Sequence, residues 1–282
     1  MIKRLAPAKI NLFLEVEGKR KDGYHNITTL FLKVGLYDRL SFKKIDKGIN
    51  VECRHSLIPD DHEKNLVYRA ASLMHKKLTK DQGIEIHLEK NIPVGAGLGG
   101  GSSDAATTLL ALNDIWELNL STKELCSLGK KLGADVPLFL IPDTAVLAKG
   151  IGDRLRPVKI RKKFWIVLIN PGIFIATKDI YKALPGSLTK AGFDVKLLIH
   201  ALQNADLDSI GKTLFNRLET VVFKKQKVLE KLKQKVSALG VRAVLMSGSG
   251  SVIFGILRNR EEAIGIKNGL QGICEVMVVK SL

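Results

Sequence analysis

The chain has 282 residues, 45 Lys and Arg against 28 Asp and Glu, and a formal net charge of +17. Its hydrophobic fraction of 45% with 26% charged residues excludes a disordered chain, and its length allows one large domain or two of ordinary size. The positive balance favours anionic partners, which include nucleic acids, anionic membrane surfaces and phosphorylated small molecules.

The cysteines and the N-terminal segment indicate the compartment. Cys53, Cys126 and Cys274 form no CxxC pair, and the six histidines show no zinc-ligand spacing. We therefore expect a reduced, cytoplasmic protein without disulfides or a structural metal. Polar residues such as Lys9 and Asn11 interrupt the N-terminal apolar stretch, so it lacks the core of a signal peptide. No apolar run approaches the ~18 residues that span a bilayer.

The first predicted elements are strands. Residues 8–16 alternate between apolar and polar types, which predicts a half-buried strand. Lys9 and Asn11 share the polar face, and this periodicity alone favours a solvated face for both. A charged turn at 19–23 separates this strand from a second one at 26–34.

A helix and a strand precede a glycine-rich segment. The spacing of apolar residues predicts a helix over 65–78, and alternation predicts a strand over 84–89. Five of the seven residues from 95 to 101 are glycine, and residues 102–104 are Ser-Ser-Asp, which are good N-cap types. A buried stripe behind them predicts a helix through Trp116.

The next helix carries clear boundary signals. Ser121 and Glu124 form a capping box, and Gly133 ends the helix. Asp135 follows immediately, in the sequence LGADVP, where its ordinary role is to cap a further helix. A capping aspartate can still present its free oxygen to a substrate.

After about residue 155 the pattern changes to a continuous apolar strand and long helices. Predicted here are a strand at 164–169, a basic helix at 224–239 ended by Gly240, strands at 241–246 and 252–257 around the loop 247–251 (SGSGS), a helix at 261–270 and a strand at 275–280. Strands and helices are mixed, and the early strands are sequence neighbours. This order favours two α+β domains, 1–155 and 156–282.

The glycine-rich loop is well suited to bind phosphate. Glycine lets backbone N–H groups approach an anion closely, and the helix that follows offers free N–H groups and a favourable dipole. The loop fits GxGxxG, but no strand with an acidic residue follows about 20 positions on, which excludes a Rossmann site. It contains no lysine, so it is not a Walker A loop.

Several residues have an ordinary interpretation on their own. Tyr24 and His25 follow the charged turn and would be loop residues, although His25 is the only histidine beside both an aromatic residue and a glycine-containing turn. Thr177 and Tyr181 lie in IATKDIY, where domain packing is the default role.

Together, the segments PAKINLFL, DGYH, PVGAGLGGGSSDAA, LGADVP and SGSGS resemble the GHMP kinases in order and spacing, over essentially the whole chain. The resemblance implies an N-terminal domain like domain 2 of ribosomal protein S5 and a ferredoxin-like C-terminal domain. It also implies an ATP-dependent kinase with Mg²⁺, which acts on a cytidyl diphosphate substrate. The resemblance implies that this substrate would be 4-diphosphocytidyl-2-C-methyl-D-erythritol, an isoprenoid precursor, which would be phosphorylated on its 2-hydroxyl.

The resemblance also assigns roles by motif position. Asp135 would be the general base, and Lys9 would keep it ionised, since an adjacent cation lowers a carboxyl pKa. Tyr24 and Tyr181 would enclose the cytosine ring, His25 would hydrogen-bond its edge, and Asn11 and Thr177 would contact the substrate. The expected ATP-binding residues are Asn65, Leu66, Pro93, Val94, Gly95, Ala96, Gly97, Leu98, Gly99, Gly100, Gly101, Ser102 and Ser103. The ligands of Mg²⁺ are not assigned.

Two alternatives remain open at this point. The glycine-rich loop also permits another small-alcohol kinase of this family, of the homoserine or mevalonate type, but such substrates carry no base for Tyr24 and His25. The charge of +17 permits a basic RNA-binding protein of S5-like fold. Because aromatic residues are only 6% and the charge is spread along the chain, we expect no nucleic-acid partner. A monomer or weak homodimer is expected.

Overall fold

The structure is a computed structural model that describes residues 1–282 except 54, 56–63, 79–81 and 186–191. The chain forms two compact units that alternate along the sequence. Unit 1 comprises Met1–Ala8, Leu36–Val94 and Gly99–Pro142, and unit 2 comprises Lys9–Gly35, Gly95–Leu98 and Asp143–Leu282. The long strands β1 (Ile2–Lys19) and β2 (His25–Ile45) each contribute residues to both units. A single domain boundary after residue 155 stays a prediction.

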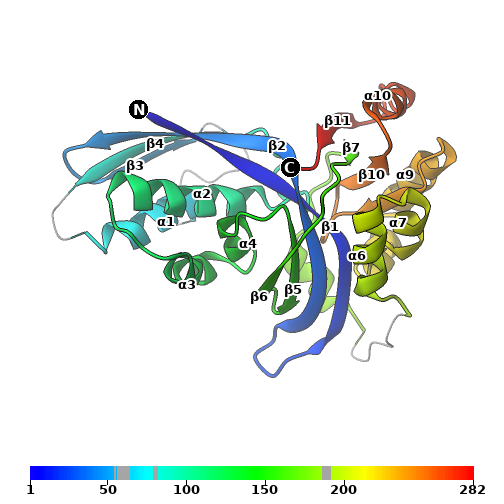
Figure 1. The fold of residues 1–282 in the computed structure, drawn as a ribbon, viewed down its shortest axis with the longest axis horizontal. Helices are drawn as coiled ribbons and strands as arrows, with labels where there is room; N and C mark the ends of the chain where they lie inside the picture. Colours follow the sequence, from blue (N-terminus) through cyan, green and yellow to red (C-terminus); the bar gives the residue numbers. More distant parts are fainter. Residues whose placement is uncertain (54, 56–63, 79–81, 186–191) are drawn as a thin grey trace. The chain divides into compact units, whose positions relative to one another are not determined.

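Unit 1 is a small sheet covered by helices. In it, β4 (Gly83–Glu89) pairs antiparallel with the end of β2 and parallel with β3 (Ile49–Cys53). The predicted inward face of β4, formed by Ile84, Ile86 and Leu88, is buried. The helices are α1 (Leu66–His75), α2 (Gly100–Ile115), α3 (Thr122–Leu132) and α4 (Val136–Leu140), and α1 and α2 pack together beneath the sheet (Figure 1).

The helix ends in unit 1 follow the local sequence signals with one correction. The capping box of Ser121 and Glu124 is present, and α3 ends at Gly133, as predicted. The N-terminus of α2 was predicted wrongly, because residues 102–104 lie inside the helix. Gly99 is the N-cap, and its φ of 71° makes the turn into the helix three residues earlier than the polar side chains suggested.

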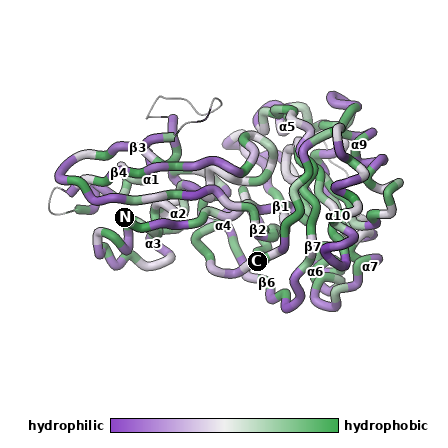
Figure 2. Tube along the Cα trace, turned by 90° about the horizontal axis from the view of Figure 1, so that it is seen from above, coloured by the Kyte–Doolittle hydropathy of each residue, from purple (hydrophilic) through white to green (hydrophobic). Residues whose placement is uncertain are grey.

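Unit 2 contains the remaining strands. The first part of β2 pairs with β5 (Ala145–Gly150), β5 pairs with β6 (Arg154–Val158), and β1 pairs with the short β8 (Phe215–Asn216). A separate antiparallel sheet has the order β11 (Glu275–Lys280), β7 (Trp165–Asn170), β10 (Ile253–Leu257) and β9 (Ala243–Met246). Figure 2 shows the hydrophobic character of β7, which is buried between its neighbours.

The helices of unit 2 pack on its core. They are α5 (Thr177–Lys182), α6 (Val195–Asn204), α7 (Leu207–Thr213), α8 (Glu219–Lys225), α9 (Lys227–Ala238) and α10 (Arg260–Gly269). The predicted helix over 224–239 is therefore wrong in its continuity, because Gln226 has a non-helical backbone, with φ −131° and ψ 76°, which separates α8 from α9. No helix among the described residues is both long and apolar enough to cross a membrane.

The predicted half-buried strand at 8–16 exists within β1, but neither of its faces is solvated. Lys9 is 4% exposed and Asn11 is 2% exposed, so both are buried like Ile10 between them. The solvated face expected from periodicity is therefore wrong, because distant segments of unit 2 cover it.

Candidate active site

Lys9 and Asn11 form a buried polar cluster in unit 2. Lys9 Nζ donates a hydrogen bond of 2.6 Å to Asn11 Oδ1, and Asn11 Nδ2 donates one of 2.9 Å to Thr29 Oγ1. The backbone N–H of Asn11 donates to Ser247 Oγ at 3.3 Å. We call Lys9, Asn11, Thr29 and Ser247 the Lys9 cluster. Because each polar group has a fixed neighbour, the ammonium of Lys9 is held in one place.

The two small-residue loops lie against each other beside this cluster. Lys9 N donates to the carbonyl of Leu98 at 2.9 Å, and Ser247 Oγ donates to the carbonyl of Gly97 at 2.9 Å. A Cβ atom on Gly97 would lie 2.1 Å from the Ser247 carbonyl oxygen, and the φ of Gly97 is +80°. Only glycine fits this position, so residues 95–98 and the SGSGS loop form one tightly packed surface of unit 2.

Asn216 supports the SGSGS loop from below. Its Nδ2 donates to the carbonyls of Met246 and Gly248, at 2.8 and 2.7 Å. A structural role of Asn216 was not predicted from the sequence, because an isolated asparagine after a phenylalanine matches no motif. Its two hydrogen bonds hold the loop in the shape that receives Gly97.

In unit 1 the second half of the glycine-rich loop opens helix α2. Its 16 residues give a dipole with the positive end at Gly99–Gly101, and its first turn holds no acidic residue. Ser103 Oγ is buried and has no hydrogen-bond partner within the described part of the chain. Ser102 Oγ lies 3.9 Å from the position that a Cβ on Gly133 would occupy, which brings the LGADVP segment close to this helix end. An anion fits this helix end.

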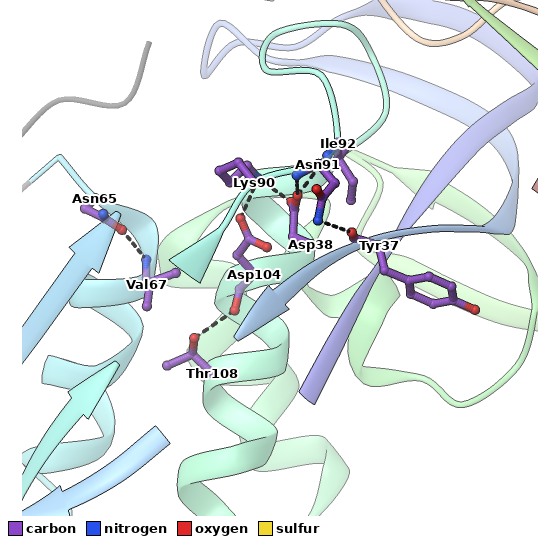
Figure 3. A network of polar contacts seen from close by, with 9 residues as sticks. All are labelled: Tyr37, Asp38, Asn65, Val67, Lys90, Asn91, Ile92, Asp104 and Thr108. Atoms are coloured by element: carbon purple, nitrogen blue, oxygen red, sulfur yellow. Dashed lines mark hydrogen bonds and ion pairs between the residues drawn. The ribbon is translucent and has the colours of Figure 1, made fainter. Parts of the chain in front are cut away.

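The expected adenine-pocket residues are also close to the N-terminus of α2. Asn65 caps α1, with its Oδ1 accepting from Val67 N at 2.9 Å (Figure 3). A Cβ on Gly101 would contact Leu66 Cδ1 at 3.4 Å. The structure thus brings Leu66 beside the glycine-rich loop, with Asn65 directly before it in the sequence, and a role of either residue in ATP binding stays a prediction.

Asp135 occupies the N-cap position of α4, as expected, but its side chain makes no capping hydrogen bond. The residues that follow it, Val136 and Pro137, are buried and fix the helix in place. Its carboxylate is therefore not used for capping the helix. The pairing of Asp135 with Lys9 stays a prediction.

The expected substrate residues of unit 2 fall into two groups. The rings of His25 and Tyr181 lie 5.3 Å apart between centroids, although 156 positions separate them in sequence. Burial, together with the charge of Lys19, lowers the pKa of His25. Thr177 shares a hydrogen bond of 2.8 Å with Ser249 of the SGSGS loop. Tyr24 is 60% exposed, and its enclosure of a base stays a prediction.

One charged cluster near the loop was not predicted from the sequence. Lys90 Nζ donates to Asp104 Oδ2 at 2.7 Å and also to the Asp38 carboxylate, and all three side chains are at most 3% exposed (Figure 3). Asp38 Oδ1 accepts from the backbone N–H groups of Asn91 and Ile92, at 2.6 and 2.8 Å. We call Asp38, Lys90 and Asp104 the Lys90 cluster. Asp104 was considered only as a helix cap.

The surroundings of Asp104 shift the pKa of its carboxyl group. Burial raises the pKa of Asp104 to about 7, and the nearby Asp38 carboxylate adds to the rise while Lys90 opposes it. Among the described residues no three His, Cys, Asp or Glu side chains are grouped to hold a metal ion.

Family comparisons agree with this geometry. The GHMP kinases N terminal domain matches residues 65–142, and the GHMP kinases C terminal domain matches residues 198–275. The chain belongs to the GHMP kinase family, and the predicted α+β class and kinase family are confirmed. The glycine-rich loop and LGADVP lie in the first matched segment, and the SGSGS loop lies in the second.

Full-length relatives are more specific. A 4-diphosphocytidyl-2-C-methyl-D-erythritol kinase of Syntrophus aciditrophicus is 42% identical, with 100% of both chains covered. The kinase of the same name from Exiguobacterium sibiricum is 40% identical over 98% of this chain and 96% of its own. A crystal structure of 4-(cytidine 5'-diphospho)-2C-methyl-D-erythritol kinase superposes with a TM-score of 0.87 at 36% identity, covering 99% of this chain and 98% of that one.

Proposed function

We propose that this chain transfers the γ-phosphoryl group of ATP to the 2-hydroxyl of 4-diphosphocytidyl-2-C-methyl-D-erythritol, in the synthesis of isoprenoid precursors. Relatives named for this activity match over the full length at 40–42% identity. The observation that carries the choice of substrate is the contact between His25 and Tyr181. A small alcohol such as homoserine or mevalonate offers nothing for two aromatic rings to recognise.

The glycine-rich loop, residues 93–103, is the proposed site of the ATP phosphates. The backbone N–H groups at the start of α2, together with the helix dipole, fit a phosphate group. The unpartnered hydroxyl of Ser103 adds a polar atom at the same end of the helix. Mg²⁺ in kinases is held largely by phosphate oxygens and water with one or two carboxylates, and it neutralises phosphate charge when bound.

The proposed chemistry needs one base and one cation. Asp135 takes the proton of the 2-hydroxyl while the hydroxyl oxygen forms a bond to the γ-phosphorus of ATP. The bond from that phosphorus to the β–γ bridging oxygen breaks, which releases ADP. The ammonium of Lys9, held by Asn11, provides positive charge for the transferring group. Such a transfer has a loose transition state, so positioning and electrostatics supply most of the catalysis.

The proposed base recognition uses a neutral imidazole. Because the pKa of His25 is lowered by burial and by Lys19, the ring carries one donor and one acceptor nitrogen at neutral pH. That pattern suits the edge of cytosine, which offers both kinds of group. Tyr181 and Tyr24 supply faces for offset stacking with the base.

The decisive experiment is a coupled ADP-release assay with Mg·ATP and a panel of acceptors. The panel contains 4-diphosphocytidyl-2-C-methyl-D-erythritol, homoserine, mevalonate and no acceptor, and Asp135→Ala measures background ATP hydrolysis. Turnover with the cytidyl compound alone supports the proposal. Turnover only with homoserine or mevalonate would keep the fold and the loop but reject the base-binding role of His25.

A pH profile tests the base-binding role separately. Protonation of His25 removes its acceptor nitrogen, so KM for the cytidyl substrate should rise several-fold as the pH falls through the lowered pKa of the ring, below 6.5. KM for ATP should stay constant over the same range. His25→Gln should remove the rise, and a KM that rises equally in this variant would contradict the role of His25.

The remaining inferences concern the setting of the enzyme. We infer a cytoplasmic protein that acts as a monomer or weak homodimer, since its relatives are small-molecule kinases. RNA binding is not proposed, because aromatic residues are only 6% of the chain and its full-length relatives are named as small-molecule kinases.

A further inference from the structure

The Lys90 cluster consists of three charged side chains that are nearly removed from water. Asp38 is 0% exposed, Asp104 is 2% and Lys90 is 3%. Taking charges out of water costs several kcal/mol per ion, and the attraction between them often does no more than offset this cost. Two carboxylates share one ammonium in this cluster, so a contribution to the free energy of unfolding does not by itself explain why the cluster is buried.

The connections of the cluster show what it joins. Asp38, in β2, accepts hydrogen bonds from the backbone of Asn91 and Ile92, which lead into the glycine-rich loop. Lys90 reaches Asp104, which lies in the second turn of the helix that follows the loop. The cluster therefore ties the chain segment before the loop to the helix after it (Figure 3).

The middle of the glycine-rich loop, between the two ends that the Lys90 cluster joins, does not belong to unit 1. Gly95–Leu98 belongs to unit 2, whereas the segments up to Val94 and from Gly99 onward belong to unit 1. Within unit 1 the two ends are closely packed, since a Cβ on Gly100 would lie 3.1 Å from Ile92 Cγ2 and 3.2 Å from Lys90 Nζ. The start of α2 is thus seated directly on the cluster.

We propose that Asp38, Lys90 and Asp104 are positioning residues for nucleotide binding, which hold the first turn of α2 and the segment before the loop at the spacing that receives the ATP phosphates. This inference rests on the proposed function in that ATP occupies the loop. The three side chains act through the backbone of Ile92 and of Gly99–Gly101, and they do not contact the nucleotide themselves.

The charge state of the cluster sets the design of the test. Asp104 faces Asp38 from β2, Lys90 from the end of β4 and, at longer range, the Cys53 thiol of β3, whose own pKa is raised by burial. When Asp104 carries a proton, one ammonium meets one carboxylate in the cluster. An asparagine imitates that neutral form, because its oxygen accepts from Lys90 and its N–H₂ replaces the proton.

The experiment measures the Kd of Mg·ATP by titration calorimetry and the unfolding midpoint of each variant. Asp104→Asn should bind within about twofold of wild type, whereas Asp104→Ala cuts the tie and should bind about tenfold more weakly or worse. Ile84→Ala is the matched control. Ile84 is fully buried in β4, the strand that ends just before Lys90, and it lies six residues before Lys90, or about 20 Å along the chain. This control should lower the midpoint and leave Kd unchanged.

The outcomes separate this inference from the proposed function. If wild type binds Mg·ATP and Asp104→Ala binds equally well, the cluster has only a structural role and the inference is overturned. If wild type does not bind Mg·ATP, the proposed function fails first and takes the inference with it.

A second variant covers the case in which Asp104→Ala does not fold. Asp104→Glu keeps the carboxylate but lengthens the buried side chain by one methylene, so it should displace the start of α2 and bind Mg·ATP more weakly than Asp104→Asn does. Equal Kd values for wild type, Asp104→Asn and Asp104→Glu overturn the inference.

Discussion

Each unit holds one buried lysine beside the glycine-rich loop, and the two lysines have different partners. Lys9 donates to the amide oxygen of Asn11, a bond that leaves the ammonium charge in place. Lys90 donates to two carboxylates, which more than neutralise it. In the proposed function Lys9 provides positive charge for the transferring phosphoryl group, whereas the proposed role of the Lys90 cluster is to hold the backbone in place.

The neighbours of the two lysines follow the same division. Lys9 is packed among the small residues of two loops, and a Cβ atom on Gly248 would lie 3.3 Å from Lys9 Nζ. Lys90 is enclosed by strands and by α2, and no ligand is proposed to contact it. The comparison therefore predicts that changes near Lys90 affect stability first and changes near Lys9 affect turnover first.

The largest effect is expected for Lys90→Met. This variant leaves Asp38 and Asp104 buried without their shared cation, and breaking a buried ion pair from one side costs about 3–5 kcal/mol. Chemical denaturation should show this loss in unfolding free energy. A stability equal to that of wild type would contradict the division between the two clusters.

Lys9→Met should act on catalysis instead. Removing the positive charge near the transferring phosphoryl group should lower kcat about 100- to 1,000-fold with little change in KM. Steady-state kinetics on the cytidyl substrate would measure it, with the unfolding midpoint as a check on folding. An effect confined to KM would show that Lys9 binds substrate and does not serve the transition state.

Gly97→Ala tests the contact between the two loops. The left-handed backbone costs an alanine about 1–2 kcal/mol, and its Cβ would overlap the Ser247 carbonyl, so Mg·ATP affinity should fall at least tenfold. Gly265→Ala in α10 is the matched control, since a Cβ there meets open space. The control should keep wild-type affinity and gain up to about 1 kcal/mol in stability.

The smallest effect is expected for the pH dependence of stability in Asp104→Asn. The folded-state pKa of Asp104, about 7, lies above its ordinary 3.8, so the stability that its bound proton provides is complete below pH 4 and is lost as the pH rises toward 7. Asparagine does not titrate. The stability of the variant relative to wild type should therefore increase by roughly 1–2 kcal/mol between pH 6 and pH 8. A constant difference in thermal or chemical denaturation at the two pH values would contradict the raised pKa.

Features encoded by neighbouring residues could be predicted from the sequence. The capping box at Ser121 and Glu124, the end of α3 at Gly133 and the inward face of β4 each depend on a few adjacent positions. The expectation that the glycine-rich loop binds phosphate is also local, because it depends on composition and on the helix that follows, and it stays a prediction. The choice of Tyr24, His25 and Tyr181 depended on resemblance to a family.

Features made by distant contacts could not be predicted in this way. Lys9 and Asn11 alternate with apolar residues like a solvated strand face, and they are buried because Ser247, 236 residues after Asn11, covers them. Lys90 and Asp38 are 52 residues apart, and neither position carries a motif. The break at Gln226 has no glycine or proline beside it to signal the end of a helix.

The contact between Asn11 and Ser247 also has a consequence for synthesis of the protein. Ribosomes add about 5–20 residues per second, so roughly 10–50 s pass between the appearance of Asn11 and that of Ser247. All segments of unit 1 have been made by Pro142, well before the SGSGS loop exists. During that interval Lys9 and Asn11 lack the loop that covers them in the finished chain. A nascent chain thus completes the environment of Lys9 late in synthesis, and a chain arrested before residue 247 cannot form it.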